Sequence, residues 1–257
     1  LEHLDGLRGV AALWVVLFHA ATPATAAAVP RWIYVPLVDW GHLGVPVFFT
    51  LSGFVIARSL GRRAVDGRVA GRFMVRRFLR LTPPYYVSLA VGLAVTWLST
   101  LVEGEPFASE GPITVARLLA HLVYLQEATG LGSFQPIYWT LCFEMSFYLV
   151  LVAALWAATS LDRVVAPIGR RRWGLAVVLV PMIGLALATA PEGAGALAVP
   201  TLVNFLPTLP CFLVGAVVWW VVDGRLPWWA AAVLIELLVV VSAMRWAGFH
   251  LTSTVTA

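Results

Sequence analysis

The chain has 257 residues, of which 61% are hydrophobic and only 12% are charged. A soluble domain carries about twice that share of charge, because its surface must be polar. The composition therefore excludes an ordinary soluble enzyme, a disordered chain and a disulfide scaffold, and it indicates a protein that lies in lipid.

The basic residues also exclude nucleic acid as a partner. All 17 are Arg, and the formal net charge is +4. They cluster between long apolar runs, which is the pattern of cytoplasmic loops in membrane proteins. A nucleic-acid-binding patch would instead lie on a soluble, polar surface.

Several apolar runs reach the roughly 20 residues that a helix needs to cross the hydrocarbon core. The sequence predicts an all-α polytopic membrane protein with about seven transmembrane helices plus one short interfacial or re-entrant helix. The short helix is 115–126, which carries Arg117 and His121 and is expected on the outer side. The predicted spans are 7–28, 41–60, 82–102, 136–158, 173–190, 199–222 and 226–247.

The distribution of Arg predicts the orientation of these spans. Segments 58–80 and 162–172 are rich in Arg and are expected to be cytoplasmic together with the N-terminus. The acidic segment 103–110 between them is expected outside. Of the 17 Arg, only Arg31, Arg117 and Arg245 then face outward. We therefore expect a multi-pass protein of the cell inner (plasma) membrane.

The first predicted helix contains Arg8 and His19, which are 11 residues apart. At about 100° per residue, both project from one face, roughly 16 Å apart along the axis. Arg8 is expected near the cytoplasmic mouth and His19 well inside the membrane. Such a face suits a long donor with a charged head and a reactive tail. The alternative is an Arg that snorkels to the interface and a His that bonds a neighbouring helix.

The second predicted helix is rich in small residues. Gly41, Gly44 and Gly53 permit close backbone approach, and for Gly53 we favour helix packing over a functional role. Ser52 is expected near the middle of the membrane, where it is a candidate cavity-lining residue. No G-x-S-x-G elbow surrounds it, so it is a poor nucleophile.

The third predicted span opens with Arg76, Arg77 and Arg80, followed by Pro83 and Pro84. Arg77 and Arg80 are three residues apart and share a helix face, which suits a phosphate clamp. The alternative is that these Arg only orient the protein. The prolines are expected to end or kink the helix.

The fourth predicted span carries Glu144 in an apolar run, with Tyr148 one turn further on the same face. His19 lies at a similar expected depth, so His19 and Glu144 are a candidate general-base pair. The alternative is a protonated Glu that hydrogen-bonds another helix. The remaining histidines lack metal-ligand spacing, and no metal site is expected.

Five segments, in this order and spacing, resemble the acyltransferase 3 family of membrane acyltransferases. They are LDGLRGVAALWVVLFHA near the N-terminus, GVPVFFTLSGFVIARSL (44–60), RRFLRLTPPYY (76–86), YWTLCFEMSFYLV (138–150) and PCFLVGAVVW (210–219). The resemblance implies a membrane enzyme that takes an acyl group, usually acetyl, from cytoplasmic acyl-CoA. The implied acceptor is a hydroxyl of a carbohydrate or glycoside.

By this resemblance His19 is the catalytic base, and Glu144 belongs to the active-site cavity as a second catalytic candidate. The donor-binding residues are then Arg8, Arg77 and Arg80. Acyl-CoA is a co-substrate, and no permanently bound cofactor is implied. Further candidate cavity-lining residues are Asp5, Ser52, Trp139 and Tyr148.

The sequence departs from the family in length. The family usually has about ten spans and a late motif similar to YSLYLIH, which is absent here. We therefore expect residues 1–257 to form a single membrane-embedded acyltransferase domain that is incomplete at the C-terminus. The alternative function is a non-enzymatic transporter or channel that uses the buried His, Glu and Arg as a substrate or proton pathway.

Overall fold

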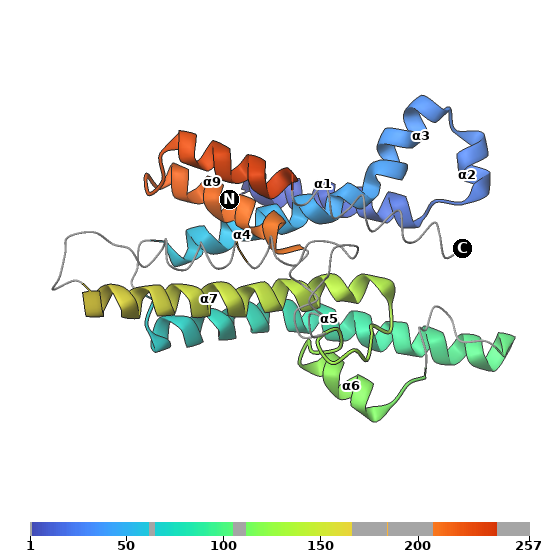
Figure 1. Cartoon of the computed structure of the whole chain (residues 1–257). Helices are drawn as coiled ribbons and strands as arrows, with labels where there is room; N and C mark the ends of the chain where they lie inside the picture. The colour runs from blue at the N-terminus through green and yellow to red at the C-terminus, as the bar shows by residue number, and fades with distance from the viewer. Residues whose placement is uncertain (1, 62–64, 105–111, 166–183, 185–207, 241–257) are drawn as a thin grey trace, which may run out of the picture. The chain divides into compact units, whose positions relative to one another are not determined.

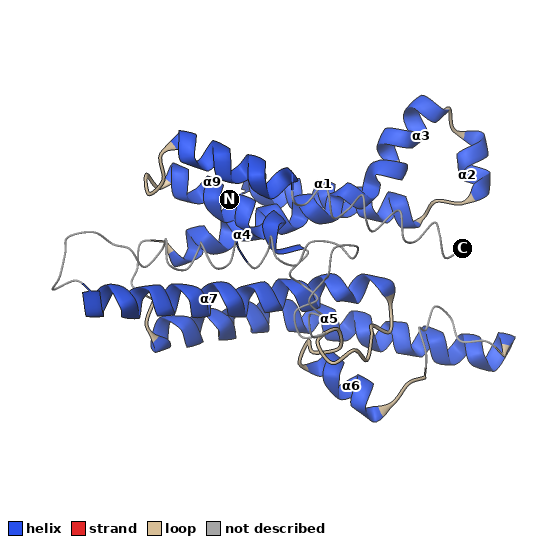
Figure 2. Cartoon of the chain, viewed as in Figure 1, coloured by secondary structure: helices blue, strands red, loops and turns tan. Residues whose placement is uncertain are grey.

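A computed structural model describes residues 2–61, 65–104, 112–165, 184 and 208–240. The secondary structure of these residues is helical, without a strand (Figure 2). Three helical stretches are long and apolar enough to cross a membrane, namely Arg31–Leu60, Gly67–Val102 and Trp139–Arg163. The prediction of an all-helical membrane protein is therefore confirmed, whereas the number of seven spans stays a prediction.

The described residues fall into two compact units. Unit 1 comprises Leu1–Gly61 and Pro207–Ala257, and unit 2 comprises Arg62–Leu206. The predicted span 173–190 and most of the second Arg-rich segment, 162–172, lie outside the described residues.

Unit 1 begins with α1 (Glu2–His19), which is shorter than the predicted span 7–28. The predicted C-terminal boundary at residue 28 is wrong, because a second helix, α2 (Pro23–Ala28), begins after a break. The side chain of Thr22 accepts the backbone N–H of Thr25, and the Thr25 side chain accepts the backbone N–H of Thr22. This capping box, with a proline next in the chain, starts a new helix and prevents continuation of α1.

The chain of unit 1 then runs through α3 (Arg31–Leu37) and the short η1 (Asp39–Leu43) into α4 (Gly44–Leu60). After unit 2 it resumes with α9 (Leu209–Val222), followed by the apolar helix Trp228–Val240. Each of the predicted spans 41–60, 199–222 and 226–247 thus contains a helix in its described part.

The closest helix contact of unit 1 joins α4 to α9 through two glycines. A Cβ atom on Gly53 would overlap the backbone carbonyl oxygen of Phe212, and one on Gly215 would overlap that of Thr50. Phe49 and Phe212 stack beside them with ring centroids 4.5 Å apart. The prediction that Gly53 serves helix packing is therefore confirmed.

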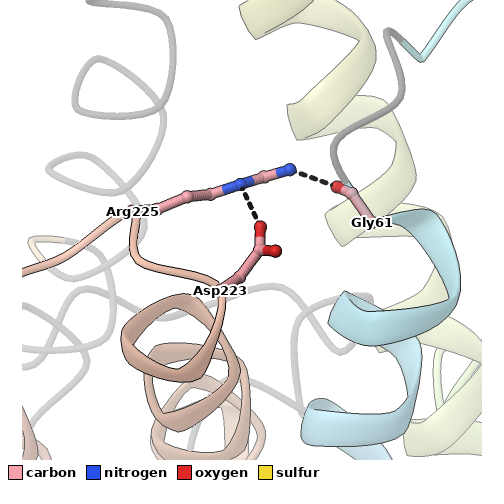
Figure 3. Close-up of polar contacts among 3 residues, drawn as sticks. All are labelled: Gly61, Asp223 and Arg225. Carbon is pink, nitrogen blue, oxygen red and sulfur yellow. Dashed lines mark hydrogen bonds and ion pairs between the residues drawn. The ribbon is translucent and has the colours of Figure 1, made fainter.

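The C-terminal ends of α4 and α9 are joined by Arg225 (Figure 3). Its guanidinium donates to the backbone oxygen of Gly61, at the C-terminal end of α4, and its Nε lies 2.8 Å from Oδ2 of Asp223. Gly61 itself has a φ of 56°, which favours glycine. A cation at a helix C-terminus also interacts favourably with the unpaired carbonyls there.

Unit 2 is built on α5 (Gly67–Glu103), a helix of 37 residues. Of the two alternatives for Pro83 and Pro84, the one in which they end the helix is wrong, and α5 begins well before the predicted start of the third span at residue 82. Asp66 caps the start of the helix with its carboxylate, which accepts the backbone N–H of Val69, and the helix continues through both prolines. Each proline removes one backbone hydrogen bond, a loss that transmembrane helices tolerate.

The rest of unit 2 packs along α5. It contains α6 (Val115–Leu122), η2 (Pro136–Tyr138) and α7 (Trp139–Val165). The predicted short helix in 115–126 and the predicted span 136–158 both correspond to helices of the structure. Figure 1 shows α6 beside the middle of α5, whose C-terminal turns continue past it.

Candidate active site

In unit 1, the structure brings Arg8 of α1 together with Ser52 of α4. Nη2 of the half-buried Arg8 lies 3.5 Å from Oγ of Ser52, whose side chain is only 2% exposed. The guanidinium carbon also lies 4.6 Å from the centroid of the Phe48 ring. Two residues predicted separately, one for donor binding and one for a cavity wall, are therefore neighbours.

His19 is the last residue of α1 and is exposed within the described residues. Its Nδ1 lies 2.9 Å from the backbone oxygen of Val15. A carbonyl oxygen only accepts, so Nδ1 carries the proton, and in the neutral ring Nε2 keeps its lone pair. The Phe18 ring packs edge-on against the imidazole, with centroids 5.2 Å apart. This geometry suits a base that acts through Nε2.

In unit 2, a buried carboxyl group lies on α7. Glu144 is 2% exposed, and Oε1 accepts a short hydrogen bond from the hydroxyl of Tyr148, one turn later. The predicted neighbourhood of these two residues is confirmed. Phe73 of α5 packs edge-on against the Tyr148 ring, at a centroid distance of 6.0 Å.

Arg77 joins the same cluster from α5. Its guanidinium carbon lies 5.3 Å from the Phe73 ring centroid and 5.7 Å from that of Tyr148. Arg77 is half-buried, whereas Arg80 is exposed. Although helix spacing predicts a shared face for these two residues, Arg77 alone turns toward the carboxyl-bearing helix.

The other candidate residues have simpler surroundings. Asp5 on α1 is exposed. Trp139, the first residue of α7, is half-buried and packs edge-on against Phe143 at a centroid distance of 5.2 Å. His19 belongs to unit 1 and Glu144 to unit 2, so the proposed general-base pair stays a prediction.

Sequence reasoning missed a polar cluster beneath α6. His121 is fully buried, and the backbone N–H of Phe134 donates to its Nε2 over 3.2 Å. The ring is therefore neutral, with its proton on Nδ1, which lies 2.7 Å from the hydroxyl of Tyr85. Burial first, and the charge of Arg117 second, lower the pKa of His121 to about 4.

Arg117 is buried on the same side of α6, with 3% of its surface exposed. It donates to the backbone oxygens of Gly132 (3.2 Å), Ser133 (2.6 Å) and Pro112 (3.4 Å), and its guanidinium stacks over Phe134. The signal in the sequence was the spacing of Arg117 and His121 by four residues on a short apolar helix.

The turn after α6 completes this cluster. Tyr124 has a φ of 59°, a conformation that a bulky side chain adopts only when its surroundings hold it. Its ring stacks on Tyr85 at 4.8 Å, its hydroxyl donates to Thr82, and its backbone oxygen accepts the thiol of Cys142. Burial raises the pKa of the Tyr124 hydroxyl.

Gln126 is fully buried in the same turn. Its amide nitrogen lies 3.4 Å from the backbone oxygen of Tyr138. Its side-chain oxygen has no donor among the described residues. A water molecule or a hydroxyl group is the kind of donor that would satisfy such an oxygen.

Comparison with known proteins decides the family. The acyltransferase domain family, Acyl_transf_3, matches residues 1–253. The chain belongs to this acyltransferase family. No solved structure matches the chain significantly.

Three relatives illustrate the breadth of this acyltransferase family. Protein 2 in the picA locus of Rhizobium radiobacter is 37% identical over 109 residues, covering 40% of this chain and 49% of the relative. Acyltransferase MdmB of Streptomyces mycarofaciens is 32% identical over 193 residues, covering 71% and 46%. Peptidoglycan O-acetyltransferase OatA of Listeria monocytogenes serovar 1/2a is 27% identical over 159 residues, covering 59% and 24%. The chain therefore spans about half the length of these relatives or less.

Proposed function

We propose that this chain is part of a membrane O-acyltransferase. It would transfer an acyl group, most simply acetyl, from cytoplasmic acyl-CoA to a hydroxyl of a carbohydrate or glycoside. The observation that carries the proposal is the family match over residues 1–253. Similarity to a peptidoglycan O-acetyltransferase supports a glycan acceptor.

The donor is proposed to bind where the Arg-rich start of α5 meets the cytoplasm. The predicted seven-span topology puts this end, the N-terminus and segment 162–172 on the cytoplasmic side. Arg8, Arg77 and Arg80 would bind the phosphates of acyl-CoA, because guanidinium groups form paired hydrogen bonds with phosphate oxygens. Two of these guanidinium groups have restrained positions, which supports the proposal. Arg77 is half-buried, and Arg8 contacts Ser52.

The chemical step is a direct transfer. Nε2 of His19 removes the proton of the acceptor hydroxyl, and the oxygen attacks the thioester carbonyl. A new C–O bond forms, the C–S bond breaks, and the CoA thiolate leaves and takes up a proton. The hydrogen bond from Nδ1 to Val15 supports this role, because it fixes the tautomer that leaves Nε2 free to accept.

Glu144 is the second proposed catalytic residue. A carboxyl group is expensive to bury, and here it is held by the hydroxyl of Tyr148 beside the guanidinium of Arg77. We assign it to the active-site cavity, where it would help His19 to accept the proton or hold the acceptor.

The test follows label from acetyl-labelled acetyl-CoA into saccharide. Membranes would carry the intact natural protein, its His19→Ala variant, its His3→Ala variant or an empty vector. His3 is a matched control, because it is also an exposed histidine of α1. The expected result is label with the unaltered protein and with His3→Ala, and a loss of at least 100-fold with His19→Ala.

Two other results would change the proposal. Equal label in the His19→Ala variant would remove His19 from the mechanism while keeping the activity. No label above the empty vector, with folded protein and several acceptors and acyl lengths, would favour the transporter or channel. In that case, flux of a proton or solute through liposomes would be measured instead.

A further inference from the structure

The helix α6 is amphipathic, but its polar face is buried in the protein and its apolar face is exposed. Its two polar side chains, Arg117 and His121, are 3% and 0% exposed. Its exposed side carries Val115 at 72%, Leu119 at 58% and Val123 at 56%. A helix that lies on a membrane surface turns its charged face to water and its apolar face inward. Here the charged face is inside the protein.

The neighbouring residues extend this apolar surface. Between residues 112 and 125 the exposed side chains are apolar apart from Thr114, which caps α6. Ile113, Leu122 and Leu125 are 47%, 40% and 46% exposed. Such a continuous patch is costly in water, since each exposed apolar Å² costs about 25 calories per mole.

The two buried polar side chains of α6 itself need no water. The guanidinium of Arg117 is bonded to backbone oxygens, and both ring nitrogens of His121 have partners. These two side chains therefore meet the condition for polar groups at membrane depth, which is that they are satisfied within protein.

The position of α6 along α5 supplies an independent measure of its depth. The hydroxyls of Tyr85 and Tyr86 bond His121 and the backbone oxygen of Leu122. At the rise of a helix, these tyrosines lie about 25 Å from Glu103, the last residue of α5. The stretch between them exposes large apolar side chains, including Val87, Trp97 and Leu101. Thus α6 is held at the start of the apolar part of α5, and Figure 1 shows it beside the middle of that helix.

We propose that α6 is a re-entrant helix whose exposed apolar face contacts the acyl chains of the bilayer. Of the two arrangements that the sequence allows, this excludes a helix lying at the water surface. The partner of this face is lipid rather than another helix, because helix interfaces in membranes are enriched in small residues or use polar side chains, and this face has few of either. The α4–α9 contact of this protein uses the small residues Gly53 and Gly215, whereas the exposed face of α6 is made chiefly of Val and Leu.

Spin-label accessibility in liposomes shows whether lipid, water or protein covers the exposed face of α6. The intact protein would carry Cys142→Ser, which keeps a donor for Tyr124, and Cys211→Ala. One nitroxide is then placed at Leu119→Cys or, in a second variant, at Val123→Cys. Leu98→Cys, 57% exposed on α5, serves as the lipid control, and Arg68→Cys, exposed near the start of α5, serves as the water control. Collision rates are measured with oxygen, which concentrates in lipid, and with a water-soluble nickel chelate.

The expected result is an oxygen-to-nickel ratio at Leu119 and Val123 within about twofold of that at Leu98, and at least tenfold above that at Arg68. A ratio like that of Arg68 would overturn the proposal, because water would then cover α6. Low collision rates with both reagents would also overturn it, because protein would then cover the helix. Since no acyl transfer is measured, failure here is distinct from failure of the proposed function.

Discussion

Two helix contacts in this protein are built on opposite principles. In unit 1, α4 meets α9 where glycines let the two backbones touch. In unit 2, α6 meets α5 through the hydroxyls of Tyr85 and Tyr86, which bond His121 and the backbone oxygen of Leu122. The first contact depends on the absence of side chains and the second on their polar groups. The first therefore tolerates no added volume, and the second tolerates no lost hydrogen bond.

The largest expected effect comes from adding volume to the α4–α9 contact. Gly53→Val puts side-chain atoms where the backbone of Phe212 lies, and a backbone does not give way as the end of a flexible side chain does. We expect a loss of about 3 kcal/mol or more in unfolding free energy. Thermal unfolding in detergent measures it, with Gly9→Ala as the control.

Gly9 has open space around it, so Ala there is expected to be neutral or to stabilise α1 by up to ~1 kcal/mol. Equal unfolding of the two variants would show that the α4–α9 backbones are not in contact.

The next effect comes from removing the buried cation of unit 2. Arg117→Met keeps much of the side-chain length but leaves the backbone oxygens of Gly132 and Ser133 without their donor. We expect a loss of about 3 kcal/mol. Thermal unfolding measures it, and Arg72→Met, an exposed site on α5, is expected to change stability by less than about 0.5 kcal/mol. If both variants lose the same unfolding free energy, the bonds from Arg117 to Gly132 and Ser133 do not stabilise the protein.

A smaller effect depends on pH through His121. Its pKa lies near 4 in the folded protein, below the ordinary value of 6.5. As the pH falls, this histidine therefore becomes protonated in the unfolded chain before it does so in the folded protein. Stability is therefore complete above about pH 6.5 and is lost as the pH falls toward 4. Unfolding midpoints across this range should slope less in His121→Gln than in the unaltered protein. His3→Gln, at an exposed site, should leave the slope unchanged. Parallel slopes for all three proteins would mean that His121 is not buried in its neutral form.

The smallest effect is expected at Gln126. Replacement by Met removes one long hydrogen bond to Tyr138 and also removes an oxygen without a donor among the described residues. These changes oppose each other, so stability should change by less than about 1 kcal/mol. A much larger loss in thermal unfolding would indicate that a bound water molecule or hydroxyl normally occupies this oxygen.

The sequence predicted what depends on local spacing. Apolar runs predicted the helices, and the small side chain of Gly53 predicted a close contact. The four-residue spacing of Glu144 and Tyr148 predicted their pairing, because residues one turn apart are neighbours on any helix. Each of these inferences needs only the geometry of one helix or the size of one side chain.

What the sequence did not predict depends on contacts between distant residues. Nothing local shows that Tyr85 bonds His121, 36 residues later. The same is true of Arg77, which turns toward α7 while Arg80 stays exposed. Two helix boundaries predicted from local sequence were also wrong. A capping box at Thr22 divides the first predicted span. The helix α5 continues through Pro83, near which the third span was predicted to begin.

The two prolines inside α5 have a mechanical consequence. One helix of about 55 Å carries the Arg-rich end, the Arg77 cluster and the tyrosines that hold α6. Pro83 and Pro84 lie between Arg77 and Tyr85, and each lacks the backbone N–H that stiffens the rest of the helix. A displacement of the arginine end, such as a ligand drawing Arg77 inward, is therefore expected to bend α5 at the two prolines and to leave Tyr85 and the loop that it anchors in place.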